Sequence, residues 1–328
     1  MNTSPLNGKT DLVSMTVHLD GKAMSDDYVI ESIKVTREVN RLGTARIVLS
    51  DGGPSQEEFA LSESDMLVPG VRVQVRMGYH QDTGAVFKGI IVKHGVRVRE
   101  DGRSQVVLTC TDSAVRLTAG RKSAVYRGQD ESDIWQEVIE EQGLTLRGGG
   151  GAKEQAEAVA QDAGKGTVAP PTPDLVRYYN SDWDFILTRA AANGRVVLVD
   201  DTELAIAQPA LTGNSCGLRL AYGESMMAFS AEMDACDQPG SVSGTVTFQG
   251  SALAVPGKTI ELAGVGGRFN GEVYIARVEH TLERGMWTTE VGFGMSPRWF
   301  AASNPALQAL PAAIPAAFLW EIPVSPWS

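Results

Sequence analysis

Alternating apolar and polar residues dominate both ends of the chain. The segment Val13 to Leu19 reads Val-Ser-Met-Thr-Val-His-Leu, which is the two-residue period of a strand with one buried face. The same pattern predicts six further short strands at 33–39, 45–49, 71–77, 86–92, 96–99 and 105–112. Turn signals separate them, among them Gly43, Pro69-Gly70, Gly95 and Asp101-Gly102. Short strands at regular spacing favour an antiparallel barrel or sandwich over roughly residues 11–118.

The middle of the chain changes to a helical period. Asp130 to Gln142 carries apolar residues at helical spacing, with Asp130 as the N-cap and Gly143 after the last turn. A second helix is predicted over Asp182 to Asn193, capped by Ser181 and ended by Gly194. Between the helices, the glycine- and proline-rich residues 148–173 predict a surface excursion.

A hairpin and a second set of strands follow. The hairpin is predicted over 196–199 and 203–207, around Asp200-Asp201. The later strands are predicted at 218–220, 227–231, 244–249, 259–262, 271–278 and 288–293. The Ala/Pro-rich tail from 301 to 328 belongs to neither set.

These segments predict a mainly β protein with an α/β insertion, in which two tandem tube-like antiparallel β-barrels are joined by a helical segment. The predicted division is a first barrel domain at 1–125, a mixed helical connector at 126–210, a second barrel domain at 211–300 and a tail at 301–328.

The two strand-rich halves echo each other. Val68-Pro69-Gly70, an alternating strand, Phe87, an apolar strand and His94 occur in order in the first half. The second half repeats this order with Val255-Pro256-Gly257, Phe269 and His280, although the spacing from Phe to His is longer. Pro-Gly before a strand is a common turn device that chance can produce. The ordered series favours two copies of one barrel.

Composition narrows the class of protein. The chain has 328 residues, of which 43% are hydrophobic and 21% charged, as in globular proteins of two or more domains. It has 29 Lys and Arg against 40 Asp and Glu, a formal charge of −11, which argues against nucleic-acid binding through a basic face. Cys110, Cys216 and Cys236 form no C-x-x-C pair and no disulfide framework. The start lacks the basic and apolar regions of a secretory signal, and no segment reaches the roughly 20 apolar residues of a membrane helix. We therefore expect a protein that folds in the cytoplasm.

Candidate chemistry is weak throughout. His18, His80, His94 and His280 are not at metal-ligand spacing. In Gly164-Lys165-Gly166-Thr167, a glycine follows the lysine directly, where a phosphate loop needs Ser or Thr. Gly264-Val265-Gly266-Gly267 opens no helix, whereas a dinucleotide-binding loop would open one. Asp200-Asp201 fits a turn, Trp183 a packed anchor and Asp184 a helix cap. We predict no catalytic, cofactor-binding or metal residues, and no enzyme.

Several motifs resemble one family. Tyr178-Tyr179-Asn180-Ser181-Asp182-Trp183-Asp184-Phe185-Ile186, with Arg189-Ala190 and Asn193-Gly194, resembles the baseplate hub shared by VgrG tip proteins of type VI secretion, phage late control D proteins and other contractile injection systems. The resemblance extends through Ala45–Asp51, Gly78-Tyr79, Phe87-Lys88-Gly89 and Gly271 to His280, and covers roughly residues 11–298. Unlike a fused VgrG chain, the sequence continues for only about thirty residues after Phe293-Gly294, so the spike is either a separate polypeptide or lies outside this sequence.

The resemblance implies a structural role. Such hubs are homotrimers whose six barrels join a sixfold inner tube to a threefold spike, and whose partners are the tube protein, the spike protein and baseplate wedge components. It implies assembly in the bacterial cytoplasm into a phage tail or injection particle, contact with a target membrane only through that particle, and no cofactor. The alternatives are a particle-associated effector or cell-wall-degrading enzyme, which would need a carboxylate pair or metal cluster, and a free carbohydrate-binding β-protein.

Overall fold

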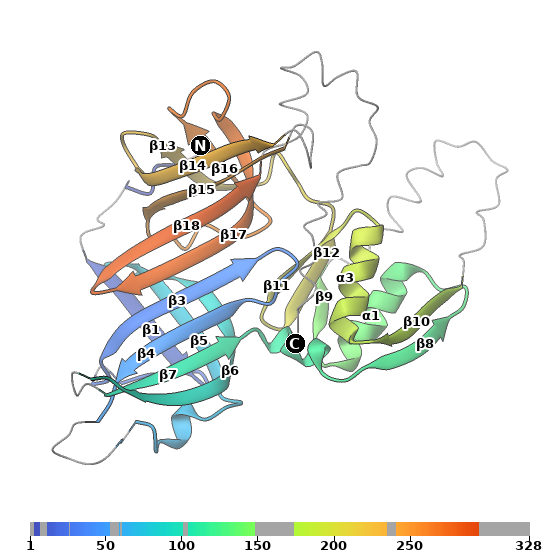
Figure 1. The fold of residues 1–328 in the computed structure, drawn as a ribbon, viewed down its shortest axis with the longest axis horizontal. Helices are drawn as coiled ribbons and strands as arrows, with labels where there is room; N and C mark the ends of the chain where they lie inside the picture. Colours follow the sequence, from blue (N-terminus) through green and yellow to red (C-terminus); the bar gives the residue numbers. More distant parts are fainter. Residues whose placement is uncertain are drawn as a thin grey trace. The chain divides into compact units, whose positions relative to one another are not determined.

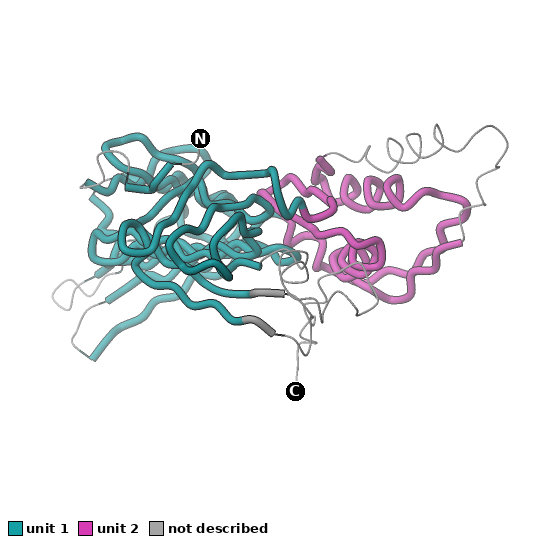
Figure 2. The backbone as a smooth tube through the Cα atoms, turned by 90° about the horizontal axis from the view of Figure 1, so that it is seen from above, with its two compact units in different colours: residues 1–113, 210–310 teal, residues 114–209, 311–328 magenta. Residues whose placement is uncertain are grey.

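The computed structural model describes residues 3–6, 12–25, 27–52, 59, 61–100, 104–147, 174–234 and 241–294. Within these ranges the chain is mainly β with an inserted α/β segment, which confirms the predicted fold class (Figure 1). It divides into two compact units, Met1–Ser113 with Ala210–Leu310 and Ala114–Pro209 with Pro311–Ser328, coloured separately in Figure 2. The predicted four-part division stays a prediction, and the predicted excursion at 148–173 and tail at 301–328 lie outside the described residues.

Unit 1 is built around one large sheet. Its first half contributes β1 (Val13–Leu19), β2 (Lys22–Ala23), β3 (Ile30–Glu38), β4 (Thr44–Ser50), β5 (Arg72–Tyr79), β6 (Asp82–Val98) and β7 (Ser104–Thr111). Its second half contributes β13 (Ser215–Ala221), β14 (Met226–Asp234), β15 (Ser241–Gln249), β16 (Thr259–Ala263), β17 (Gly271–Glu283) and β18 (Met286–Gly294). A short 3-10 helix lies at Asp65–Leu67, and a second, at Ser113–Thr118, begins with the last residue of the first segment of unit 1 and continues into unit 2.

The two halves share one order of strand pairing. The first half is ordered β3-β4-β7-β6-β5-β1, and the second β14-β15-β18-β17-β16-β13. Each strand except β2 thus has a counterpart at the same place in the chain order, which is the duplication expected from the sequence echo. One difference is that β1 pairs antiparallel with β5 whereas β13 pairs parallel with β16. Closure of each half into a tube stays a prediction, because the described pairings run from β3 to β1 and from β14 to β13 without closing.

The register of pairing is also repeated. Thr44 to Ser50 pair with Thr111 to Gln105, and Ser243 to Gln249 pair with Gly294 to Thr288. β6 shifts register against β7 between Ile91 and Lys93, and β17 shifts against β18 between Ile275 and Arg277. β3 and β14 carry matching irregularities after Ile30 and after Met226. Bulges insert one residue at a fixed place, so their coincidence aligns the halves residue by residue.

The two Pro-Gly turns make equivalent hydrogen bonds. The Gly70 N–H donates to Ile91 O at 2.8 Å, and the Gly257 N–H donates to Ile275 O at 2.9 Å. Both glycines have positive φ, +101° and +86°, as the third residue of a turn with proline in second place requires. Ile91 is therefore the counterpart of Ile275, and His94 corresponds to Val278 rather than to His280. The equivalence of the two Pro-Gly turns predicted from the sequence is therefore confirmed, whereas the predicted equivalences of Phe87 with Phe269 and of His94 with His280 are wrong.

A shared joint merges the two halves. β17 pairs antiparallel with β3, from Arg277 opposite Glu38 to Glu283 opposite Ser32. In Figure 1 these strands lie side by side where the second half meets the first. Each half keeps its own apolar core, one centred on residues such as Ile33 and Phe87 and the other on residues such as Phe248 and Phe293. Leu282 and Trp287 of the second half pack into the first core, so the joint is apolar as well as hydrogen-bonded.

Unit 2 contains the two predicted helices, α1 (Glu131–Glu141) and α3 (Asp182–Ala192). Gly143 and Gly194 both have positive φ directly after them, and the next residue donates back into the last turn, Leu144 to Ile139 O and Arg195 to Ala190 O. The strands are β8 (Lys122–Tyr126) paired with β10 (Leu175–Asn180), and β9 (Thr145–Arg147), β11 (Val196–Asp200) and β12 (Glu203–Ala207) in a second sheet. The predicted β11–β12 hairpin is confirmed.

We predict that the two Pro-Gly turns contribute equally to stability. Gly70→Ala and Gly257→Ala each place a Cβ on a backbone at positive φ, which costs about 1–3 kcal/mol of unfolding free energy. Denaturant unfolding of each variant measures the loss. Gly267→Ala is the control, because nothing lies within 4 Å of its added Cβ. Two similar losses above the control support the alignment of the halves, and a loss confined to one turn contradicts it.

Candidate functional site

The motif that carries the family resemblance forms the end of β10 and the start of α3. Ser181 caps the helix in extended conformation, and its hydroxyl accepts a hydrogen bond from the Asp184 N–H at 3.1 Å. The same hydroxyl donates to the Asp184 carboxylate at 2.7 Å. Trp183 is 9% exposed. The expected roles of Asp184 as a cap residue and of Trp183 as a packed anchor are confirmed.

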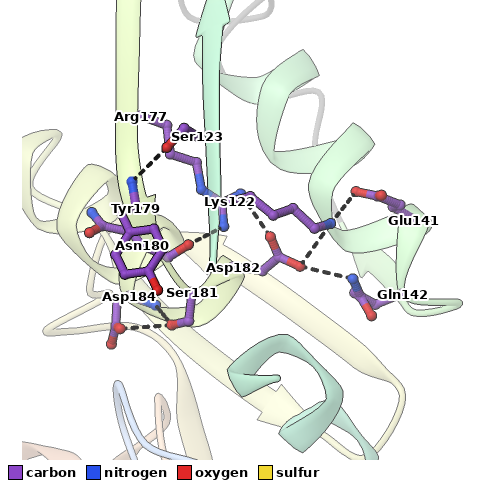
Figure 3. Close-up of polar contacts among 10 residues, drawn as sticks. All are labelled: Lys122, Ser123, Glu141, Gln142, Arg177, Tyr179, Asn180, Ser181, Asp182 and Asp184. Atoms are coloured by element: carbon purple, nitrogen blue, oxygen red, sulfur yellow. Dashed lines mark hydrogen bonds and ion pairs between the residues drawn. The ribbon is translucent and has the colours of Figure 1, made fainter. Parts of the chain in front are cut away.

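A buried ion pair lies directly beside this cap (Figure 3). Arg177 Nη1 lies 2.7 Å from Asp182 Oδ1, and each side chain is 1% exposed. Asp182 Oδ2 accepts a hydrogen bond from Gln142 at 2.9 Å and lies 3.4 Å from Lys122 Nζ. Arg177 donates to Asn180 O at 2.6 Å, and its guanidinium stacks 5.1 Å from the Phe185 ring. The pair therefore connects β8, β10, α1 and α3.

The chemistry of this network is structural. The Asp182 carboxylate already contacts Arg177, Gln142 and Lys122, which leaves it poorly placed to act as a general base. The hydrogen bond to Glu141 raises the pKa of Lys122, so this ammonium stays charged. Local sequence patterns do not predict the pair, because Arg177 and Asp182 come from different elements and neither stands in a charge pattern.

An exposed apolar face lies on the same two strands. Val125 of β8 is directly opposite Val176 of β10, and they are 55% and 65% exposed. Tyr178 is 81% exposed, and the Arg121 guanidinium lies 5.5 Å from the ring centroid of Tyr179. Exposed aromatic and branched side chains gathered on one face are typical of contact surfaces.

The four histidines stay apart, each in its own setting. His94 contacts Ser62 Oγ and Leu67 O, both at 2.9 Å. His280 is 2% exposed and contacts Thr289 Oγ1 at 2.9 Å. Burial, with a smaller contribution from the Arg37 charge, lowers the pKa of His280 to about 3. His18 lies in β1 and His80 at the turn after β5. Among the described residues no three His, Cys, Asp or Glu side chains gather as a metal site.

The cysteines offer no activated nucleophile in the part of the chain that the structure describes. Burial raises the pKa of the Cys110 thiol to about 12, and burial also raises that of Cys216. Cys236 lies outside the described residues.

The loops with suggestive sequences are turns. Asp201 has φ of +59° in the tight connection between β11 and β12. Gly264 and Gly266 have positive φ between the antiparallel strands β16 and β17, as expected for a hairpin loop. Gly164 to Thr167 lie outside the described residues. Within the described ranges, no helix has the length and apolar character needed to cross a membrane.

We predict that breaking the buried pair destabilises unit 2. Arg177→Met leaves Asp182 charged and without its main partner, and Asp182→Leu does the same to Arg177, so each costs about 3–5 kcal/mol. The double variant costs less than the sum, because no uncompensated charge remains. Thermal unfolding of the two single variants and the double variant measures the three losses of stability. Arg147→Met, which breaks the exposed pair with Glu203, is the control. If the loss in the double variant equals the sum of the two single losses, Arg177 and Asp182 are not energetically coupled and the prediction is wrong.

We predict that His280 makes stability depend on pH. Its pKa is about 3 in the folded state against an ordinary 6.5, so the unfolded chain binds the extra proton between these values. Its contribution is complete above pH 6.5 and is lost as pH falls, by about 2 kcal/mol at pH 5. His280→Gln keeps a hydrogen-bonding group but does not titrate, so its unfolding free energy changes less between pH 7.5 and 5. Parallel profiles for both proteins contradict the assignment.

Solved structures with this fold are tail proteins and a secretion component. The 43 kDa tail protein of prophage MuSo2 from Shewanella oneidensis matches with TM-score 0.67 and 10% identity, over 88% of this chain and 99% of that one. A tail protein from Neisseria meningitidis MC58 matches with TM-score 0.62 and 12% identity, over 88% and 98%. The E. coli c3393 protein, a type VI secretion component described as similar to T4 tail proteins gp27 and gp5, matches with TM-score 0.57 and 11% identity, over 84% and 76%.

At these identities the similarity shows a shared fold. The expected resemblance is thereby confirmed at the level of tail-protein fold, and the specific assignment to VgrG or late control D proteins stays a prediction. No curated protein sequence matches the chain. A family model described as the Alg8 N-terminal domain (Alg8_N) matches residues 9–245 and 237–284, well over half of the chain, and the protein therefore belongs to the Alg8 N-terminal domain family.

Proposed function

We propose that this protein is a structural hub of a phage-tail-like contractile injection particle. In this role three copies form a ring whose six sheet halves face a sixfold inner tube, while the threefold symmetry of the ring matches a spike. Tube, spike and baseplate wedge proteins are the proposed partners. The particle assembles in the cytoplasm, and the role is mechanical rather than catalytic.

The repeat in unit 1 is the observation that supports this proposal most directly. One polypeptide carries two halves with the same order β3-β4-β7-β6-β5-β1 and β14-β15-β18-β17-β16-β13, and with matching bulges. A ring of three such chains repeats one structural unit six times, which lets threefold and sixfold neighbours share an axis. The fold shared with two tail proteins and a type VI secretion component agrees with this role.

No specific observation favours the particle-associated enzyme. Asp182 contacts the buried Arg177, the partly exposed Lys122 and the Gln142 amide, a network that is better explained by packing of unit 2. The carbohydrate-binding alternative would use exposed aromatic platforms, and the exposed tyrosines of β10 fit a protein contact equally well.

Mass photometry of the purified chain tests the assembly. We expect a species of three times 35.1 kDa, about 105 kDa, that persists on dilution, and a ring with a central opening by negative-stain electron microscopy. When the tube protein from the neighbouring gene is added, that protein should stack on one face of the ring. A monomer at micromolar concentration with and without that protein contradicts the proposal.

A further inference from the structure

Two strand edges of unit 1 have no strand beside them among the described residues. The second part of β6 pairs with β7 from Ile90 to Val98, but β5 covers the opposite side only as far as Ile90. β14 pairs with β15 on one side, and it stands at the end of the sheet order on the other. Uncovered edges expose backbone donors and acceptors that can recruit another strand.

The counterparts of these two edges pair with each other inside the chain. The aligned bulges make Lys93–Val98 equivalent to Arg277–Leu282 of β17, and residues 228–234 of β14 equivalent to residues 32–38 of β3. β17 and β3 pair along these residues. The β17–β3 joint is therefore an internal template for a joint between the two open edges.

We propose that the β6 edge of one copy pairs antiparallel with the β14 edge of a second copy, in the register that β17 makes with β3. In this register Gly95 lies opposite Glu232, Val96 opposite Ala231 and Val98 opposite Phe229. The proposal rests on the proposed function only for the number of copies. The strands and residues that join the copies are inferred from the pairing of β17 with β3 and do not depend on the proposed function.

The apolar side of the two edges supports a strand partner. Val96 and Val98 are 45% and 62% exposed, whereas their counterparts at the internal joint, His280 and Leu282, are 2% and 6% exposed. On the other strand, Phe229 is half-buried whereas its counterpart Ile33 is fully buried. Pairing in the proposed register covers Val98 with Phe229 as Leu282 is covered by Ile33.

The polar side carries complementary charge. Glu232 of β14 lies opposite Gly95, so the two positively charged side chains Lys93 and Arg97 flank it diagonally on the same face. All three are exposed in the single chain. The internal joint uses the same diagonal contact, since Lys34 Nζ lies 2.6 Å from Glu279 Oε1. There the acid is on β17 and the base on β3, so the polarity is reversed.

The joint is head to tail, because it uses different strands of the two copies. Repeating it adds copies in one direction, and a closed ring leaves neither edge open, whereas an open filament leaves one of each. A ring therefore covers every exposed Val96 and Val98 in the assembly.

Disulfide cross-linking tests the register. The Val39 N–H donates to Ala276 O at 2.9 Å, which makes Glu279 and Thr36 a non-hydrogen-bonded pair and gives Gly95 and Glu232 the same close spacing. The variant Gly95→Cys/Glu232→Cys is made in a Cys216→Ser/Cys236→Ser background. Gly95 has no positive φ, and its added Cβ lies 4.0 Å from Val107 O, so the substitution fits the strand. Gly95→Cys/Ser230→Cys, two residues out of register, is the matched control.

Mild oxidation should link the Gly95→Cys/Glu232→Cys chains into a covalent ladder on non-reducing gels, at least tenfold more than the control. A ladder that ends at three chains supports both the joint and the proposed hub. A ladder that ends at another number supports the joint and overturns the trimer. If mass photometry shows a trimer but oxidation leaves only the monomer band on the gel, the proposed joint is overturned and the proposed hub is retained.

Charge reversal gives an independent measurement. Arg97→Glu places an acid beside Glu232 and should raise the concentration at which half of the assembly dissociates by about tenfold, as should Glu232→Arg. The combined variant restores the attraction with reversed sign and should recover assembly. Arg76→Glu, elsewhere on the sheet, controls for net charge. Equal losses in all three single variants without recovery overturn the joint.

Discussion

Hydrogen bonding between β17 and β3 is the interaction on which unit 1 depends. It makes one sheet of two halves that otherwise have separate cores, and side chains follow the backbone across the joint. Leu282 and Trp287 enter the first core, and the Trp287 ring lies 5.4 Å from the Tyr79 ring. The backbone has adapted to Trp287, because a Cβ at Gly250 would lie 2.0 Å from its indole. The close approach of Trp287 therefore explains why glycine stands at position 250.

Unit 2 is held by a different balance of forces. The Arg177–Asp182 pair is removed from water, so its attraction is largely offset by desolvation, and it contributes specificity more than net stability. The observed arrangement of β8, β10, α1 and α3 gives Gln142, Lys122 and the carbonyl of Asn180 their partners together with the pair. Buried apolar side chains such as Ile134, Trp135 and Ile186 form the hydrophobic core of the unit, and the pair lies among the elements that enclose it.

The sequence was informative where a local pattern decides the structure. Alternation predicted β1 at its observed bounds, and caps placed both helices within one residue. Gly95 was predicted as a turn but lies within the 17-residue strand β6, because pairing with Val107 outweighs the weak strand preference of glycine. β8 and β10 were missed because they are short and half polar. The repeat was visible in two turns, but its alignment needed the bulges, which leave no pattern in side-chain chemistry.

Divergence between the halves is as informative as their shared topology. If both halves carried the same charges, β3 would fit the open edge of β6 as well as it fits β17, and chains could exchange strands or pair wrongly. In this chain Lys34 on β3 would lie directly opposite Arg97 on β6, while Glu38 would lie opposite Lys93, and Glu232 on β14 would lie directly opposite Glu279 on β17. Each wrong pairing sets two like charges directly opposite each other, which disfavours it even though the backbone registers match. Duplication therefore supplies two interchangeable joints, and the reversed charges assign one to the interior of the chain and leave the other for a neighbour.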